Sequence, residues 1–131
     1  MLHQTERMNR MKLGFVSAIL GELSFEEMID FASENGFECV EVCCWPKGKA
    51  ERRYAGVTHI NVDEVDEAKA AYIKDYCAKK GVEISALAYY PNTMDPDLEK
   101  RAVYINHIKK LIKAAKLLGV ATVNTFVGRD P

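Results

Sequence analysis

The sequence predicts an α/β fold built from parallel β/α units, with four strands and three helices between residues 12 and 131. The first observation is a junction that recurs three times. A helical segment ends, a glycine follows and an apolar strand begins, at Gly36, Gly81 and Gly119. Glycine can adopt the left-handed backbone conformation that ends a helix at such a point. The second observation is the strict alternation of helical and extended segments, which is typical of parallel β/α units.

The composition indicates one globular domain preceded by a polar tail over residues 1–11. The 131 residues are 48% apolar and 28% charged, which is enough for a sizeable core. The net charge of −1 argues against nucleic acid and anionic membranes as partners, because it attracts neither at long range. No apolar run is long enough to span a membrane, and the tail lacks the apolar segment of a secretory signal.

The four cysteines, Cys39, Cys43, Cys44 and Cys77, favour a reducing, cytoplasmic compartment. Three of them lie within six residues on one predicted strand, a spacing that suits buried thiols better than a disulfide framework. The sequence has no C-x-x-C pair, so a zinc knuckle is not expected. No histidine adjoins Cys43 or Cys44 in the sequence, and core packing is favoured over a nucleophilic role.

The first strand is expected over residues 12–17 and the second over residues 37–43. The helix between them begins at Ser24, because Ser24 and Glu27 form a capping box in which each side chain binds the other's free backbone N–H. The apolar stripe of this helix consists of Phe25, Met28, Ile29 and Ala32. The second strand is largely apolar on both faces, as expected of a parallel strand that is covered on both sides.

A polar loop over residues 45–61 follows the second strand, and a loop of this length is usually functional or mobile. The next helix is expected over residues 62–80 and the third strand over residues 82–88. The apolar positions of that helix recur at helical spacing, at Val65, Ala68, Tyr72, Tyr76 and Cys77.

The last predicted helix has the clearest start, with Asp95 as the N-cap, Pro96 at the first helical position and Asp97 near the positive end of the dipole. Apolar side chains mark one face of this helix, at Leu98, Ile105, Ile108, Ile112 and Ala115. The fourth strand is expected over residues 120–126. The carboxyl ends of the four strands would then share one edge of the sheet, where parallel α/β folds bind ligands.

Four segments resemble, in order, the N-terminal half of the xylose-isomerase-like TIM-barrel superfamily. They are Leu13-Gly14-Phe15, Gly36-Phe37-Glu38-Cys39-Val40-Glu41-Val42, Gly81-Val82-Glu83-Ile84-Ser85-Ala86 and the helix-to-strand segment 107–120. The second segment is similar to the G-F-x-x-V-E pattern of the family's second strand. The resemblance extends over residues 12–131 and implies the first half of a (β/α)8 TIM barrel, whose complete form needs about 250 residues.

The resemblance also implies a function: the N-terminal fragment of a metal-dependent sugar or sugar-phosphate isomerase or epimerase. In that family Glu, Asp, His and Glu from strands five to eight hold a divalent metal (Mn, Mg, Co or Zn). We expect the fragment to bind no metal and to be inactive alone, with a small-molecule sugar or sugar phosphate as ligand. The family's endonuclease branch has histidines at the ends of strands three and four, which this sequence lacks, so DNA repair is not expected.

The candidate substrate-binding residues lie at or just after the ends of predicted strands, where TIM barrels place their functional side chains. They are Glu41, Trp45, Tyr90, Asn92 and Asn124. Glu41 interrupts an otherwise apolar strand, where a carboxylate is costly unless it is satisfied. It either accepts hydrogen bonds from sugar hydroxyls or orients a neighbouring ligand, or it is structural, paired with a Lys or Arg or facing solvent at a helix edge. Trp45 either packs its aromatic face against the C–H face of a sugar or anchors the following loop.

The other three candidates carry hydroxyl and amide groups that suit a polyol. Tyr90 and Asn92 either contact the substrate or belong to a packed Tyr-Pro turn. Asn124 either binds a substrate oxygen or is a satisfied core amide. His107 is expected to be structural, and His59 is expected to be a solvated loop residue rather than one that closes over a substrate. No residue is assigned a catalytic role.

Two classes of function remain open. In the first, the chain contributes substrate contacts to an enzyme whose metal site lies in the missing C-terminal half. In the second, the chain is a non-catalytic half-barrel module. Such a module would form a homo-oligomer, or pair with a partner chain, through the bare edges of its first and fourth strands.

Overall fold

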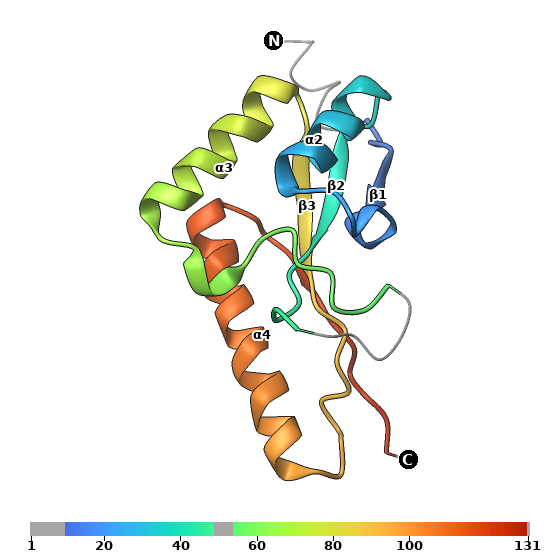
Figure 1. The fold of residues 1–131 in the computed structure, drawn as a ribbon, viewed down its shortest axis with the longest axis vertical. Helices are drawn as coiled ribbons and strands as arrows, with labels where there is room; N and C mark the ends of the chain where they lie inside the picture. Colours follow the sequence, from blue (N-terminus) through green and yellow to red (C-terminus); the bar gives the residue numbers. More distant parts are fainter. Residues whose placement is uncertain (1–9, 49–53, 131) are drawn as a thin grey trace.

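The computed structural model describes residues 10–48 and 54–130 (Figure 1). One sheet holds four strands, which are β1 (Gly14–Val16), β2 (Cys39–Cys43), β3 (Glu83–Ala88) and β4 (Val123–Asn124). The α-helices of the described residues are α2 (Phe25–Glu34), α3 (Glu67–Lys80) and α4 (Leu98–Leu118). Two short 3-10 helices are η1 (Ser17–Leu20) and η2 (Val62–Glu64). The predicted fold class is therefore confirmed.

All four strands are parallel and lie in the order β1-β2-β3-β4, as in the first half of a TIM barrel. β2 pairs with both β1 and β3, and its Glu41 lies opposite Val16 of β1 and Ala86 of β3. Ala88 of β3 is opposite Asn124 of β4. The carboxyl ends of the strands therefore meet at one edge of the sheet, which lies toward the bottom of Figure 1.

The two outer strands are shorter than predicted. β1 has three residues where residues 12–17 were expected, and β4 has two where residues 120–126 were expected. Each of these strands has a single neighbouring strand in the described sheet. An outer strand extends only as far as its single neighbour forms hydrogen bonds with it, so β1 and β4 are shorter than the apolar segments that predicted them.

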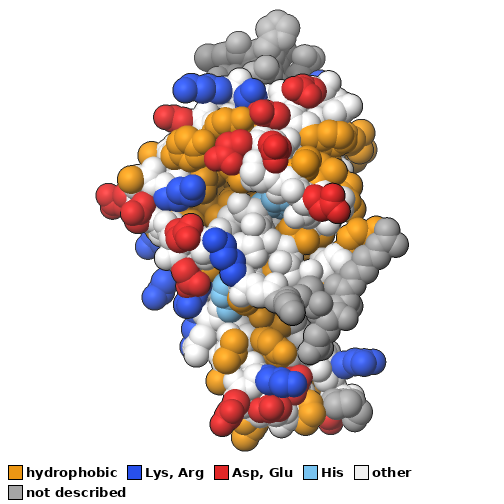
Figure 2. Space-filling model, viewed as in Figure 1, with side chains coloured by type: hydrophobic (Ala, Val, Ile, Leu, Met, Phe, Trp, Pro, Cys, Tyr) orange, Lys and Arg blue, Asp and Glu red, His pale blue; other side chains and the backbone are white. Residues whose placement is uncertain are grey.

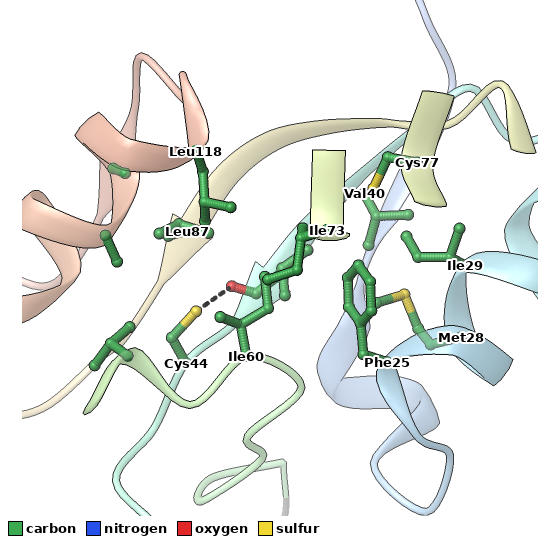
Figure 3. Close-up of a cluster of buried hydrophobic side chains, with 14 of the residues drawn as sticks. Phe25, Met28, Ile29, Val40, Cys44, Ile60, Ile73, Cys77, Leu87 and Leu118 are labelled. Carbon is green, nitrogen blue, oxygen red and sulfur yellow. Dashed lines mark hydrogen bonds between the residues drawn. The ribbon is translucent and has the colours of Figure 1, made fainter. Parts of the chain in front are cut away.

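The core lies between the sheet and the helices, and Figure 3 shows side chains of β2, α2 and α3 meeting there. Val40 and Val42 of β2 are both completely buried in it. The predicted stripe of α2 is confirmed, because its four side chains are all buried: Phe25, Met28, Ile29 and Ala32. The predicted capping box is also present, with Glu27 N–H donating to Ser24 Oγ and Ser24 N–H donating to Glu27.

The helix predicted over residues 62–80 begins later, at Glu67. Asp66 is its N-cap and accepts a hydrogen bond from the Lys69 amide at 2.8 Å, while the preceding residues form η2. The predicted apolar face was partly wrong. The buried residues of α3 are Ala70, Ile73 and Cys77.

Tyr72 and Tyr76 of α3 lie at the boundary with α2, where Tyr72 is exposed and the Tyr76 ring packs against the core. The Tyr72 hydroxyl donates to Glu26 at 2.9 Å, and the Tyr76 hydroxyl donates to Asp30 at 2.6 Å. A tyrosine satisfies its hydroxyl most readily at such an edge, because a fully buried one needs an internal partner. These two residues therefore join α3 to α2 through polar contacts.

The start and the buried face of α4 also differ from the prediction. Asp97, not Asp95, is the N-cap, because its carboxylate accepts from the amides of Glu99 and Lys100 at 3.0 and 3.3 Å. Its Leu98, Ile105 and Ile112 are 70%, 38% and 55% exposed. Ala115 of the predicted face is buried and Ile108 packs against the core, as expected. The other buried residues are His107, Leu111, Ala114 and Leu118. The two alanines allow α4 to approach the sheet closely, which explains why this face is buried.

The glycine junctions are confirmed. Gly81 and Gly119 are the C-caps of α3 and α4 with φ of 68° each, and Gly36 follows α2 with φ of 77°. An added Cβ would meet no atom within 4 Å at any of the three. The requirement for glycine therefore comes from the left-handed backbone and not from a lack of space. Among the described residues, no helix combines the length and the apolar character that crossing a membrane requires.

Candidate functional site

Glu41 points to the face of the sheet opposite the helical core. Its neighbours in β2, Val40 and Val42, point into that core, and successive side chains of a strand alternate between faces. The Tyr90 hydroxyl, just after β3, donates to Glu41 Oε2 at 2.9 Å. The Asn124 amide of β4 donates to Glu41 Oε1. Three of the five predicted site residues, far apart in sequence, therefore form one hydrogen-bonded cluster, called the Glu41 cluster below.

The Glu41 cluster is negatively charged and its hydrogen-bond donors are neutral. In the part of the chain that the structure describes, no Lys or Arg forms an ion pair with Glu41. Its carboxylate is partly buried, so the two hydrogen bonds from Tyr90 and Asn124 offset part of the cost of removing it from water. The alternative that Glu41 is paired with a cation has no support in these residues.

Tyr90 is held as a hydrogen-bond donor. Burial, followed by the hydrogen bond to Glu41, raises the pKa of Tyr90 to about 12. The Tyr90 ring also contacts the ring of Phe126, with centroids 4.8 Å apart. Phe126 is 50% exposed, so it adds an accessible apolar surface beside the polar cluster. A carboxylate, a hydroxyl, an amide and an aromatic face are the groups that proteins use to bind polyhydroxylated molecules.

Trp45 packs on the other side of the sheet. Its ring meets that of Tyr89 edge-on at 5.0 Å, and Tyr89 in turn meets the His107 ring at 4.8 Å. The Trp45 backbone is bound by the loop that follows, since its carbonyl accepts from Thr58 Oγ1 at 2.6 Å. These contacts are those of a loop anchor. Its contact with a sugar stays a prediction.

Asn92 connects the segment after β3 to the segment after β4. Its side-chain oxygen accepts from the Arg129 amide at 2.8 Å, and its side-chain NH2 donates to the Arg129 carbonyl at 3.0 Å. Thr93 Oγ1 donates to the Val127 carbonyl at 2.8 Å. Gly128 lies against this connection with φ of 99°. The connection holds the two segments that carry Tyr90 and Phe126, and a substrate contact by Asn92 stays a prediction.

His59 was predicted to be solvated, and this prediction is wrong. Its side chain is buried, with 8% exposed, and Nδ1 lies 2.8 Å from Ser17 Oγ. Nε2 lies 3.1 Å from the Leu20 carbonyl, which can only accept, so Nε2 carries the proton and Nδ1 accepts from Ser17. Ser17 Oγ also accepts from the Cys43 amide at 2.8 Å. Burial lowers the pKa of His59, which keeps the ring neutral.

The Ser17–His59 pair therefore fastens η1 and the loop before η2 to the end of β2. The sequence did not single out Ser17 as the partner of His59. The one signal was its place at the carboxyl end of the first strand, because its partner lies 42 positions away. Arg52 and Arg53, which share this loop, lie outside the described residues. His107 is buried and its Nε2 donates to the Cys44 carbonyl at 2.8 Å, in agreement with its predicted structural role.

The cysteines are free thiols, and Cys43, Cys44 and Cys77 are buried. Burial raises the pKa of Cys43 and of Cys44, and it raises that of Cys77 to about 11. Thiols of this kind stay protonated and are weak nucleophiles. Core packing, as expected from the sequence, describes these three residues.

The chain thus has parallel strands in sequential order, helices over one face of the sheet and a polar cluster at its carboxyl edge. These features define the first half of a TIM barrel. The family model described as "Xylose isomerase-like TIM barrel" matches residues 29–131, and the chain belongs to this family.

One curated relative, the uncharacterized protein YfiH of Bacillus subtilis (strain 168), is 29% identical over 120 residues, which are 90% of this chain and 36% of that protein. A D-psicose 3-epimerase solved in the presence of D-fructose has a TM-score of 0.62 at 18% identity, over 88% of this chain and 37% of the epimerase. The probable 3-DHS dehydratase AsbF from Bacillus anthracis has a TM-score of 0.56 at 24% identity, over 92% of this chain and 39% of the dehydratase. The solved structures share the fold, and this chain spans little more than a third of each protein's length.

Proposed function

We propose that this chain is the N-terminal part of a metal-dependent enzyme that isomerises or epimerises a sugar or sugar phosphate, and that it supplies substrate contacts. The observation that carries the proposal is the Glu41 cluster, which places an anionic acceptor and two neutral donors at the carboxyl edge of the sheet. The family and the likeness to a D-psicose 3-epimerase support the substrate class. The free thiols fit the cytoplasmic location that the cysteine pattern predicts.

The roles follow from the hydrogen bonds in the cluster. A sugar hydroxyl donates to Glu41 in place of one present donor, and the released Tyr90 hydroxyl or Asn124 amide turns to another sugar oxygen. Phe126 offers its exposed ring to the C–H face of the sugar. Asn92, another predicted contact, lies on the segment that follows β3, where it binds Arg129. Trp45 follows β2 and packs against Tyr89 on the other side of the sheet, so its sugar contact is the least supported of the five.

The described residues do not form a divalent-metal site of their own. Within residues 10–48 and 54–130, no three His, Cys, Asp or Glu side chains are placed to share an ion. Glu41 is the acidic residue of the cluster, and both of its oxygens already accept hydrogen bonds. We propose that the expected Mn, Mg, Co or Zn is held by residues outside this part of the chain. When bound, such a metal polarises the substrate's oxygens for proton transfer at the carbon beside a carbonyl.

Titration of the 131-residue chain with D-fructose, followed by ¹H–¹⁵N NMR, tests the proposal. We expect saturable shifts at the amides around Glu41, Tyr90 and Asn124, with a dissociation constant on the order of 1–10 mM, because one half of a site supplies few contacts. Glu41→Ala should abolish these shifts. The matched control is Glu83→Ala, at the opposite end of β3, which should leave them unchanged. Shifts that survive Glu41→Ala, or their absence in the unmodified chain, contradict the proposal.

A second candidate function, a half-barrel module that associates with another chain, rests on the exposed apolar side chains of the open face. Val16 of β1 faces away from the core and is 40% exposed, and Val127 after β4 is 87% exposed. β1 and β4 are also unpaired on their outer sides in the described sheet. Open strand edges and apolar surfaces favour association, either with a second copy or with a chain that completes the barrel.

The mass of the chain in solution separates the two candidates. We expect a module that self-associates through the face of the sheet opposite the helices to be a dimer or a larger oligomer. Its mass, measured by size-exclusion chromatography with light scattering, would be at least twice the 14.7 kDa of the monomer. Val16→Lys should restore the monomer, whereas Ile112→Lys, which also places a lysine at an exposed apolar position but on α4, should not. A monomer at all concentrations removes self-association from consideration.

A further inference from the structure

Each of the three α-helices of the described residues follows a parallel strand, so its N-terminus lies toward the side of the sheet at which the strands end. The first turn of α4 lies well beyond the end of β3, toward the bottom of Figure 1. The free amides and the dipole at a helix N-terminus are the usual binding place for a phosphate group. If the first amides of these helices are free, they can bind a phosphate group of the ligand. If side chains of the chain already cap them, they cannot.

All three ends are closed by oxygen atoms of the chain's own side chains. At α2, Ser24 Oγ accepts from the Glu27 amide at 3.2 Å and Glu27 accepts from the Ser24 amide at 2.8 Å. At α3, Asp66 accepts from the Lys69 amide at 2.8 Å. At α4, Asp97 accepts from two amides, at 3.0 and 3.3 Å. A phosphate would have to displace a side-chain oxygen at each helix.

The charge near the first turn of α2 also opposes an anion. Acidic residues stand in every first turn, namely Glu26 and Glu27 of α2, Glu67 of α3 and Glu99 of α4. Three cations stand beside them, Lys69 in α3 and Lys100 and Arg101 in α4, and two of these make contacts within the chain. The Lys69 ammonium lies 5.3 Å from the centroid of the Tyr72 ring, and Arg101 Nε donates to the Asp95 carbonyl at 3.1 Å. A phosphate at the first turn of α2 would therefore face like charge, whereas one at α3 or α4 would face acidic and basic side chains together.

The Glu41 cluster also favours an uncharged group of the ligand over an anion. Its single charge is the Glu41 carboxylate, and its other groups are a phenol, an amide and an aromatic ring. A hydroxyl of a ligand can donate to Glu41 in place of the Tyr90 hydroxyl or the Asn124 amide, so the count of hydrogen bonds is kept. A phosphate oxygen has no proton to donate at neutral pH and would be repelled.

From these contacts we infer that the portion of the ligand bound by this chain is uncharged, the free hydroxylated end of a sugar or polyol rather than a phosphate ester. This inference rests on the proposed function and narrows its substrate class. The three caps close the usual phosphate positions, and the Glu41 carboxylate disfavours an anion at the cluster itself.

The test compares D-fructose, D-fructose 6-phosphate and inorganic phosphate by NMR titration of the whole 131-residue chain at constant ionic strength. We expect D-fructose to shift the amides around Glu41 and its phosphate ester to bind at least threefold more weakly. Inorganic phosphate should give no saturable shift at the first turns of α2, α3 and α4. Because the whole chain is used, the titration also reports any contribution from Lys49, Arg52 and Arg53, which lie outside the described residues.

The outcomes separate the two proposals. Binding of the phosphate ester tenfold tighter than D-fructose, or a saturable phosphate response at any of the three helix ends, overturns the inference and leaves the proposed function standing. The absence of any response to D-fructose overturns both.

A variant tests the cause. The double variant Asp97→Ala and Glu99→Gln frees the first amides of α4 and should gain a saturable phosphate response there. The conservative Asp97→Asn keeps the capping oxygen and should gain none. If the double variant retains its dispersed NMR spectrum and gains no response, self-capping is not the reason for the exclusion.

Discussion

The replacement Asn124→Asp tests the geometry of the Glu41 cluster most directly. In the structure the Asn124 amide donates to one Glu41 oxygen, so the substitution brings two carboxylates to hydrogen-bond distance. Two unit charges about 4 Å apart repel by about 4 kcal/mol at an effective dielectric constant of about 20. Because both side chains are partly exposed, solvent screening reduces this to about 1–2 kcal/mol.

The lost hydrogen bond adds a second term, which the control variant isolates. Asn124→Ala removes the donor without adding charge and should lower the free energy of unfolding by about 1 kcal/mol. Urea unfolding at pH 7.5 should therefore place Asn124→Asp about 1–2 kcal/mol below Asn124→Ala. The difference should shrink as the pH falls toward about 4, since close carboxyl groups then share a proton and the repulsion ends.

A double-mutant cycle decides whether Glu41 is the partner. In the Glu41→Gln background the extra cost of Asn124→Asp over Asn124→Ala should disappear, because no second charge is present. If the extra cost persists in that background, or if the two Asn124 variants are equally stable at pH 7.5, Glu41 and Asn124 are not in contact and the assigned cluster is wrong.

Three further predictions concern the surrounding structure. Gly128→Ala should lower the free energy of unfolding by about 1–3 kcal/mol, because φ is 99° and the added Cβ would lie 2.7 Å from Asn92 Oδ1; its urea midpoint measures this. Burial lowers the pKa of His59, so the folded state holds fewer protons than the unfolded state, and stability should fall as the pH drops below about 6.5. His59→Gln should flatten this part of the pH–stability curve, and an unchanged slope would contradict the buried neutral ring. Leu111→Ala should cost about 2–5 kcal/mol and Ile112→Ala less than about 0.5 kcal/mol by thermal unfolding, and the reverse order would mean that the wrong face of α4 is assigned to the core.

Local signals in the sequence were enough for α2. Its capping box and its buried stripe were both predicted correctly. Both signals act within a few residues, and four of the five apolar positions fall on one face, with only Phe31 outside it. The glycines after the helices, Gly36, Gly81 and Gly119, were also read correctly, because the backbone conformation they permit is a property of the residue itself.

The longer helices were harder to read because each offers more than one apolar face. In α4 the isoleucines at 105 and 112 and the leucine at 111 lie on different sides, and the contact with the sheet decided which side is buried. The N-cap of α4 was also ambiguous in the sequence, because Asp95 and Asp97 are both good N-cap residues. The Asp95 side chain accepts from the Asp97 amide in the turn before the helix, which leaves Asp97 to cap it.

Part of the candidate site could also be predicted from the sequence, and part could not. Glu41 stood out in the sequence because a carboxylate in an apolar strand needs partners, and the parallel order of the strands placed Tyr90 and Asn124 at the same edge. Their hydrogen bonds to Glu41 join residues 49 and 83 positions apart. Likewise, only the tertiary structure showed that His59 is buried against Ser17.

The sequence by itself determined the alternation of parallel β/α units, the ends of the helices that carry local signals, and the family. Capping, backbone preference and apolar periodicity act over short distances along the chain, so they can be read in one dimension. The tertiary structure decided which helix faces are buried and which polar groups meet, because these depend on contacts between distant segments. At the carboxyl edge of the sheet, that folding brings Tyr90 and Asn124 to the carboxylate of Glu41, which lies among the apolar residues of β2.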